Sequence, residues 1–480
     1  MIGFGSNHAF GQDPSEDDDR HNTEQPKQAE QPAPVISPDA TVPEADATVR
    51  APATAAPTAK PKFGDVTTSG YLRGGFGASN QKGRMTCFQL ALPGGLFSKY
   101  RLGNECEVWG EYHLTTVVYA GDDGSYATLH FMPTVFIPTT YIGYTPTGVV
   151  NSPLQFTTST GATLSFPNLY ADIRNISWLF GGTAWAGTRY YKRESIYISD
   201  FFYWNPSGVG AGIEDINLGR DLRLSYGVFA VDGEPVPGAV TTSPPLPAQA
   251  DFGFRNDLQL RGIKFWESGE FQLGFQYIAN YSNNPAAHGG WGGTFQFVQQ
   301  FLGGDNKVAV QYGRGGGTGF GTLARFYYPD FSVRHDLAES RFRVVNVLTI
   351  QPTRWFGTQV AAVFQRDDLG SGQGSLTDWY STGGRVGFGV TDHLKVLGEA
   401  GFDRVVKSNG ADPQWLAKFT GAVAITAGRA FLTRPEVRVF GTYATWNVAA
   451  RTATVDSGRL YTTTAFLSGV TFGLQAETWW

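Results

Sequence analysis

The last fifteen residues, Phe466–Trp480, read FLSGVTFGLQAETWW and carry the clearest strand pattern in the chain. Their side chains alternate in character with a period of two, which is the period of a β-strand. One face carries Phe466, Val470, Phe472, Leu474, Ala476 and Trp480, and the other carries Thr471, Gly473, Gln475, Glu477 and Trp479. A strand with one apolar and one largely polar face separates two different environments. Because Trp479 lies on the polar face, we expect its ring to face water.

The same pattern extends over residues 67–480, as short alternating runs separated by Gly, Asn, Asp and Pro. In Leu394–Phe402 one parity carries Leu394, Val396, Ala400 and Phe402, whereas Lys395 and Glu399 share the other. The chain contains 61 Gly, 14% aromatic and only 16% charged residues, which favours strands and turns. No stretch approaches the roughly 20 consecutive apolar residues of a transmembrane helix. The sequence therefore predicts an all-β chain.

Alternation alone does not distinguish a soluble sandwich from a transmembrane barrel. Three further features favour an antiparallel transmembrane β-barrel. Long loops alternate with short turns such as Gly303–Asn306, aromatic residues cluster at expected strand ends, and the last strand ends on an aromatic pair. At about 23 residues per strand and connection, residues 67–480 would form roughly 18 strands.

Residues 1–66 differ in composition from the rest. Residues 1–65 hold eleven Asp/Glu against five Lys/Arg, and nine of the 26 prolines. Such a segment buries little apolar surface, so we expect a disordered extension. It would be a simple tether, a periplasmic spacer, or a segment that binds cell wall or sugar. The opening MIGFGSNHAFGQD lacks the basic start and long apolar centre of a secretion signal. We expect that the start is late or that a signal has been removed.

Ser69–Glu111 reads SGYLRGGFGASNQKGRMTCFQLALPGGLFSKYRLGNECEVWGE. This block resembles the beginning of the maltoporins, the sugar-selective outer-membrane porins. Trp185–Ile213, Thr433–Trp446 and the final FGLQAETWW are similar to the same family. The resemblance implies an 18-stranded barrel in the bacterial outer membrane, usually a homotrimer in the lipid bilayer, with its third loop folded into the channel. Maltose and linear glucose oligomers would diffuse through it, and the N-terminal extension would lie in the periplasm.

A sugar has apolar C–H faces and a polar rim, so a selective passive path needs aromatic rings and charged groups. In maltoporins these groups form an aromatic slide flanked by polar tracks. The matching slide positions are Tyr71, Trp109, Trp379 and Trp479; Trp109 stands where the family usually has Tyr. The matching track positions are Arg73, Arg101, Glu111, Arg193 and Asp200. Interfacial or loop-core aromatics, and surface salt bridges or loop braces, are the alternative interpretations.

The chain also departs from the family pattern. Phe202 replaces the constriction Tyr, and Ser195 and Asn205 replace Asp residues. Another slide aromatic falls at Gly293, for which Phe295 is a possible substitute on the same strand face. For the aromatic that a neighbouring subunit contributes, the candidates are Phe136, Tyr141 and Tyr144. These changes put a preference for maltodextrins in doubt.

Cys87 and Cys106 are the two cysteines of the chain. In a cell-envelope protein a pair of cysteines favours a disulfide, and maltoporins have a bridge at the matching positions. Two free thiols are the alternative.

Other chemistries find no support in the sequence. There is no phosphate-binding GxxxxGK[ST] motif, no zinc-ligand spacing and no nucleophile elbow. No feature suggests nucleic-acid binding. We therefore expect a sugar porin that has no cofactor and is not an enzyme. The alternatives are a general porin and an envelope adhesin or phage-receptor barrel. The sequence leaves open which sugar passes and how fast.

Overall fold

The computed structural model describes residues 60–92, 97–138, 148–152, 155–158, 163–232, 252–282, 284–321, 337–370, 375–451 and 466–480. Contacts divide the chain into Met1–Ser37 and Pro38–Trp480, and all described residues belong to the second unit. Residues 1–59 of the predicted extension lie outside the described residues. The division of the chain at residues 66 and 67 therefore stays a prediction.

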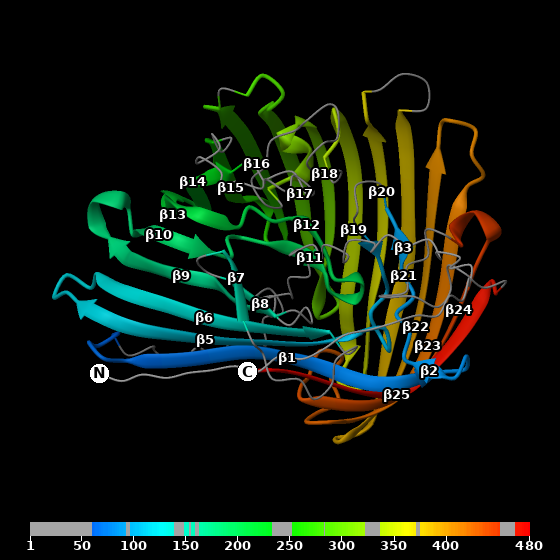
Figure 1. Ribbon diagram of the computed structural model, residues 1–480. Helices are drawn as coiled ribbons and strands as arrows, with labels where there is room; N and C mark the ends of the chain where they lie inside the picture. Colours follow the sequence, from blue (N-terminus) through cyan, green and yellow to red (C-terminus); the bar gives the residue numbers. More distant parts are fainter. Residues whose placement is uncertain are drawn as a thin grey trace, which may run out of the picture. The chain divides into compact units, whose positions relative to one another are not determined.

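Eighteen antiparallel strands of the described residues pair in chain order and close into a barrel, as predicted (Figure 1). They are β1 (Val66–Ser79), β5 (Glu107–Ala120), β6 (Tyr126–Pro138), β9 (Thr163–Ile176), β10 (Gly182–Arg189), β13 (Gly208–Gly219), β14 (Leu222–Asp232), β15 (Phe252–Trp266), β16 (Gly269–Asn280), β17 (Gly290–Phe301), β18 (Gly304–Gly315), β19 (Ser340–Thr353), β20 (Phe356–Asp368), β21 (Leu376–Thr391), β22 (Leu394–Lys407), β23 (Gln414–Thr426), β24 (Glu436–Trp446) and β25 (Ser468–Trp479). The last strand pairs with the first, with Tyr71 opposite Trp479. Closure leaves no strand edge unpaired in the wall.

The connections between the barrel strands carry shorter elements. The short strands are β2 (Gly83–Arg84), β3 (Leu90–Ala91), β4 (Phe97–Ser98), β7 (Gly148–Ser152), β8 (Gln155–Thr158), β11 (Glu194–Ile196) and β12 (Phe201–Trp204). The 3-10 turns are η2 (Ser177–Leu179), η3 (Tyr197–Ser199), η4 (Gly316–Gly319) and η5 (Val448–Ala450). No helix among the described residues is long and apolar enough to span a membrane.

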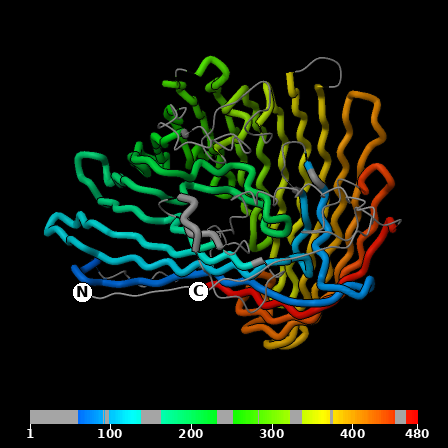
Figure 2. The backbone as a smooth tube through the Cα atoms, viewed as in Figure 1, coloured from blue at the N-terminus to red at the C-terminus, as the bar shows by residue number. Residues whose placement is uncertain are grey.

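Among the described residues, two long connections fold into the barrel and pack against its inner wall. We name them loop 1 (residues 80–106) and loop 3 (residues 190–207), which carries β11, β12 and η3 (Figure 2). In loop 3, the hydroxyl of Tyr203 donates to Gln296 on β17 at 2.7 Å, and the backbone N–H of Ile198 donates to Gln359 on β20 at 3.0 Å. In loop 1, Tyr100 hydrogen-bonds Ser381 on β21 at 3.0 Å. The described parts of loops 1 and 3 are therefore held against the inner wall.

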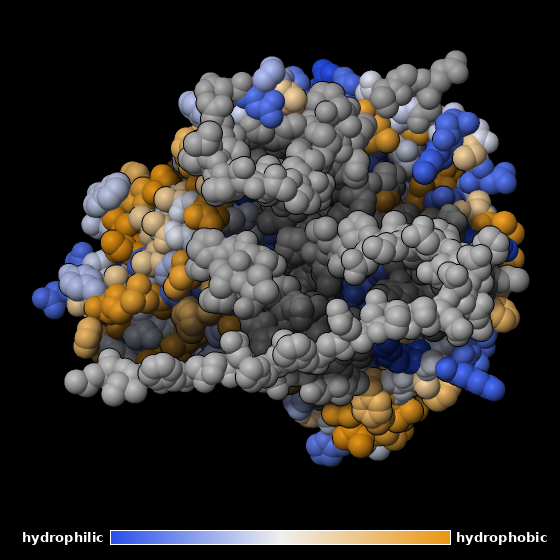
Figure 3. Space-filling model, viewed as in Figure 1, coloured by the Kyte–Doolittle hydropathy of each residue, from blue (hydrophilic) through white to orange (hydrophobic). Residues whose placement is uncertain are grey.

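The wall is polar inside and apolar outside. On β22 the inward side chains of Lys395, Glu399 and Asp403 are at most 5% exposed, whereas Val396 and Phe402 point outward and are 43% and 38% exposed. Apolar residues also gather over the outer side of β5 to β10, at the left of Figure 3. A surface whose apolar residues face outward and whose charges face inward is typical of a barrel in lipid.

Candidate functional site

Four aromatic rings form one cluster on the inner wall where the barrel closes. The rings of Tyr71 on β1 and Trp479 on β25 lie 6.3 Å apart and are parallel within 12°. Trp109 on β5 and Phe136 on β6 lie 6.0 Å apart in an edge-to-face arrangement and belong to the same cluster. Tyr71 and Trp109 are buried, whereas Trp479 and Phe136 are partly exposed. We call these four residues the ring row.

Three predicted slide residues thus meet in the ring row, together with Phe136, one of the three candidates for the neighbouring subunit's aromatic. The other two candidates, Tyr141 and Tyr144, lie outside the described residues. Phe136 comes from the same chain because β6 pairs with β5 and places Phe136 opposite Trp109. The alternation of β1 and β25 explains the inward direction of Tyr71 and Trp479, since Leu72 and Leu474 point outward.

Trp379, the fourth predicted slide residue, is not in the ring row. It lies inside the barrel on β21, where its Nε1 donates to Asp403 Oδ1 at 3.2 Å. Its ring meets Phe201 of loop 3 edge to face at 5.1 Å. These contacts belong to the core between the wall and the inward loops.

The prediction that Phe295 substitutes for the missing slide aromatic was wrong. It is 43% exposed and stacks on the outer surface near Phe271, with ring centroids 5.3 Å apart. The inward side chains of β17 have even numbers, as shown by the buried Thr294 and Gln296. Gly293 and Phe295 share the opposite, lipid-facing parity.

Ion pairs join three of the predicted polar residues, Arg73, Arg101 and Asp200, beside the ring row. Arg73 forms ion pairs with Glu105, Glu107 and Asp200, at 3.3, 2.7 and 3.0 Å. Arg101 Nη2 donates to the Tyr71 hydroxyl at 2.6 Å. This guanidinium therefore joins the charged network to the ring row.

The network continues at both ends of the ring row. Arg101 also pairs with Glu105 at 2.5 Å and with Glu477 at 3.0 Å. Glu111 accepts from Trp109 Nε1 at 3.1 Å and from the Tyr190 hydroxyl at 3.4 Å. Arg101 and Glu111 thus each bind a ring of the row directly by a hydrogen bond. Arg73 is linked to the rings indirectly, because it shares Glu105 with Arg101.

Loop 3 supplies the remaining predicted residues. Arg193 lies over the ring of Tyr190 at 3.4 Å and over that of Phe202 at 4.9 Å. Asp200 adopts a left-handed conformation after η3 and accepts from Arg73. Asn205 accepts from the Ser207 hydroxyl at 2.6 Å, so it fixes the end of loop 3.

The barrel matches one known protein family along its sequence. The family model described as LamB porin matches residues 66–480 of this chain. The chain belongs to the LamB porin family. This membership confirms the resemblance to maltoporins. The protein is therefore a porin of the outer membrane and acts as a channel rather than as an enzyme.

The chain is also similar, at low sequence identity, to solved structures of outer-membrane proteins. OccAB1 of Acinetobacter baumannii is 11% identical, covers 88% of this chain and 98% of its own, and has a TM-score of 0.47. OpdK of Pseudomonas aeruginosa is 10% identical, with 87% and 100% covered and a TM-score of 0.47. OmpT of Vibrio cholerae is 10% identical, with 87% and 100% covered and a TM-score of 0.39.

Tyr197 of loop 3 and Glu477 of β25 are central to the porin's inner network, and the sequence did not single them out as site residues. The Tyr197 hydroxyl donates to Glu477 Oε2 at 2.7 Å. The Tyr197 ring meets Trp479 edge to face at 6.0 Å. Three guanidinium groups surround this ring, those of Arg101, Arg385 and Arg434, with distances to the ring centroid of 5.0, 5.1 and 5.8 Å. Burial raises the pKa of the Tyr197 hydroxyl, so the hydroxyl remains a donor.

Glu477 could have been found from the alternation alone, because it lies two residues before Trp479 on the same strand face. Tyr197 carries no such signal, since its contacts depend on the fold of loop 3.

The Cys87–Cys106 disulfide of the porin is present, with Cα atoms 5.9 Å apart, which confirms that prediction. It closes loop 1, which carries Lys99, Arg101 and Glu105. Burial alone would raise the pKa of Glu105, but Arg73, Lys99 and Arg101 lower it well below its usual value. The ionised carboxylate therefore stabilises the loop against the wall.

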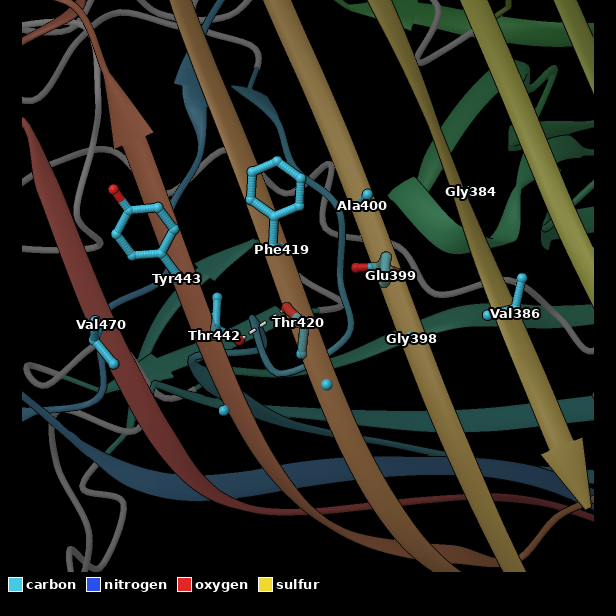
Figure 4. Close-up of a pocket in the computed structure, with 12 residues that line it drawn as sticks. Gly384, Val386, Gly398, Glu399, Ala400, Phe419, Thr420, Thr442, Tyr443 and Val470 are labelled. Carbon is cyan, nitrogen blue, oxygen red and sulfur yellow. Dashed lines mark hydrogen bonds between the residues drawn. The ribbon is translucent and has the colours of Figure 1, made fainter. Parts of the chain in front are cut away.

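A separate groove of about 660 Å³ lies on the outer side of the wall (Figure 4). Its floor includes Gly398, Gly421 and Gly441, which lie in register on β22, β23 and β24. The rim residues Phe419 and Tyr443 are 52% and 45% exposed and face lipid. This groove is therefore not part of the inner site.

Proposed function

We propose that this porin allows passive, selective diffusion of maltose, maltodextrins or related oligosaccharides along the ring row. The observation that carries the proposal is the pair of parallel rings of Tyr71 and Trp479, continued on the inner wall by Trp109 and Phe136. A ring that a sugar can reach would give its apolar face a contact of about 0.5–1.5 kcal/mol. Contacts this weak, arranged in series, allow a sugar to bind and then to move on.

Charged groups accompany the rings along the same strands. Arg73 follows Tyr71 by two residues, Glu111 follows Trp109 by two, and Glu477 precedes Trp479 by two. Two residues of a strand span about 6.6 Å on one face. A sugar on a ring therefore has a charged group beside its hydroxyl rim, and such charge-assisted hydrogen bonds replace part of its lost hydration.

Loop 3 completes the proposed path. Arg193, Asp200 and Phe202 belong to it, and Phe202 would line the constriction with bulk but without a hydroxyl. Because Ser195 and Asn205 also carry no charge, the path would depend less on ionic contacts than that of the maltoporins. Trp379 packs in the core against Phe201, so in this proposal it supports loop 3 and does not line the path.

Assembly and topology complete the proposal. We propose a homotrimer in the outer-membrane bilayer, with residues 1–66 as a periplasmic extension. Family membership supports the outer-membrane trimer.

Conductance in planar bilayers tests the proposal. Purified protein should form channels whose ion current falls when maltose, maltodextrins or other oligosaccharides are added, with a half-blocking concentration for each sugar. Channels that no sugar in a panel of mono-, di- and oligosaccharides blocks would identify a general porin. Absence of conductance would favour the adhesin or phage-receptor barrel.

A further inference from the structure

We propose that Arg434 is a positioning residue for sugar selectivity. In this proposal residues 427–435 form one side of a constriction, and loop 3 forms the other side. This inference rests on the proposed sugar path. Residues 427–435, which we name the inserted turn, connect β23 to β24. The Arg434 side chain joins the turn to Tyr197 of loop 3 by a hydrogen bond.

The inserted turn is built into the barrel. Phe431 is only 3% exposed, and its backbone N–H donates to Gln351 Oε1 at 2.8 Å. Glycines at inward positions leave room for it: a Cβ atom at Gly357 or Gly387 would lie 2.6 or 3.0 Å from the Phe431 side chain. Side chains at these wall positions would push the turn out of the lumen.

Arg434 joins the inserted turn, the last strand and loop 3. Its Nε and Nη2 donate to Glu477 Oε2 at 3.1 and 2.9 Å, and Nη2 also donates to the Tyr197 hydroxyl. Its Nη1 donates to Glu436 Oε2 at 3.3 Å. The planar fork of a guanidinium satisfies these acceptors together, which the ammonium of a lysine cannot do in the same geometry.

The same guanidinium lies over Trp479, with Cζ 4.6 Å from the ring centroid. A cation over one face of the indole holds the ring by an electrostatic attraction. Tyr197 meets the ring at its edge, and Tyr71 lies parallel to it. Arg434 therefore fixes the direction in which Trp479 presents its ring to a sugar.

Loss of Arg434 should leave the barrel folded. Glu477 keeps ion pairs with Arg101 at 3.0 Å and Arg438 at 3.3 Å, so its carboxylate stays paired. Glu436 keeps its ion pairs with Arg438 at 2.7 Å and with Lys395 at 3.4 Å. The change therefore releases the inserted turn and the Trp479 ring without leaving a buried carboxylate unpaired.

The test compares Arg434→Gln and Arg434→Lys with Arg429→Gln in the full-length protein. Arg429 is a matched control, because it lies in the same turn and pairs with Asp392 at 2.7 Å, away from Tyr197. Single-channel conductance, the half-blocking concentration of maltohexaose or of the best-blocking sugar, and the thermal unfolding temperature are measured for each.

We expect Arg434→Gln to raise the half-blocking concentration about tenfold, from the lost cation–π contact and hydrogen bonds. We also expect it to raise single-channel conductance, because the constriction loosens. Arg434→Lys should give an intermediate block because it keeps the charge, and Arg429→Gln should match the wild type in both readouts.

Two results would overturn the inference. One is a folded Arg434→Gln channel with unchanged conductance and a half-blocking concentration within about twofold of the wild type. The other is an equal change in Arg429→Gln. If no sugar blocks the wild type, the proposed sugar path fails, and single-channel conductance then tests the constriction by itself. An increase in conductance in Arg434→Gln but not in Arg429→Gln would support the constriction. No increase in Arg434→Gln would refute it.

Discussion

Replacing Trp109 by alanine should weaken sugar block much more than it changes ion current. Trp109 is 6% exposed, meets Phe136 edge to face, and donates to Glu111 from its indole nitrogen. The variant removes one ring from the ring row but leaves Tyr71 and Trp479 paired across β1 and β25. Glu111 keeps the Tyr190 hydroxyl as a donor, so the carboxylate does not become an isolated charge.

The size of the effect follows from one ring contact. At about 0.5–1.5 kcal/mol per ring, its loss multiplies the half-blocking sugar concentration by about 2 to 13. Small ions do not stack on rings, so single-channel conductance should change by a smaller factor. The assay is current block in planar bilayers, titrated with the best-blocking sugar on wild type and variant under the same salt conditions.

Two further variants keep this prediction decisive. Trp109→Phe retains an aromatic face and should recover most of the block, even if the alanine variant folds poorly, since a large-to-small core change costs about 3–5 kcal/mol. Trp291→Ala is the matched control, because Trp291 lies on the lipid-facing side of β17 and is 39% exposed. Equal effects of Trp109→Ala and Trp291→Ala, or equal changes in block and conductance, would refute the slide.

Three other outcomes concern the inner network and loop 1. Arg73→Met should lower the unfolding free energy by about 3–5 kcal/mol, because it removes the cation that pairs with the buried Asp200 carboxylate at 3.0 Å; an unchanged thermal unfolding temperature would contradict this. Reduction of Cys87–Cys106, separated by 19 residues, should remove about 3 kcal/mol, measured by thermal unfolding with and without reductant against the double serine variant. The lowered pKa of Glu105 implies a stabilisation that is complete above its usual pKa of 4.5 and is lost as the pH falls below it. Glu105→Gln should therefore unfold at a temperature that depends less on pH below 4.5, and an unchanged dependence would assign the acid sensitivity to other groups.

Strand alternation was enough to predict the wall. Period-two patterns in Leu394–Phe402 and Phe466–Trp480 assign each side chain to one face, and the structure confirms both assignments. The prediction failed at Phe295 because Gly293, taken as the family position, belongs to the outward parity. A one-residue shift of register moves a side chain to the other face of a sheet, so a single position carried over by resemblance is the least secure kind of inference.

The contacts inside the barrel could not be read from the sequence. Tyr197 and Arg434 lie 237 residues apart and meet only because loop 3 and the inserted turn both enter the lumen. A signal for the turn does exist in Gly357 and Gly387, since glycines at inward wall positions leave space. The same glycines could equally accommodate a sugar, a water or a loop, so the sequence alone does not choose among them.

The inner charges are already paired, which has a direct consequence for transport. Arg73 and Arg101 bind carboxylates at 2.5 to 3.3 Å, and Glu477 binds three guanidinium groups at about the same range. A sugar hydroxyl near these groups can gain only the difference between its own hydrogen bond and the one that it replaces. The partly exposed rings of Trp479 and Phe136 can contact a sugar without breaking an ion pair. We therefore infer that the rings provide most of the sugar affinity, whereas the paired charges keep the rings in place and keep each binding step weak enough for release.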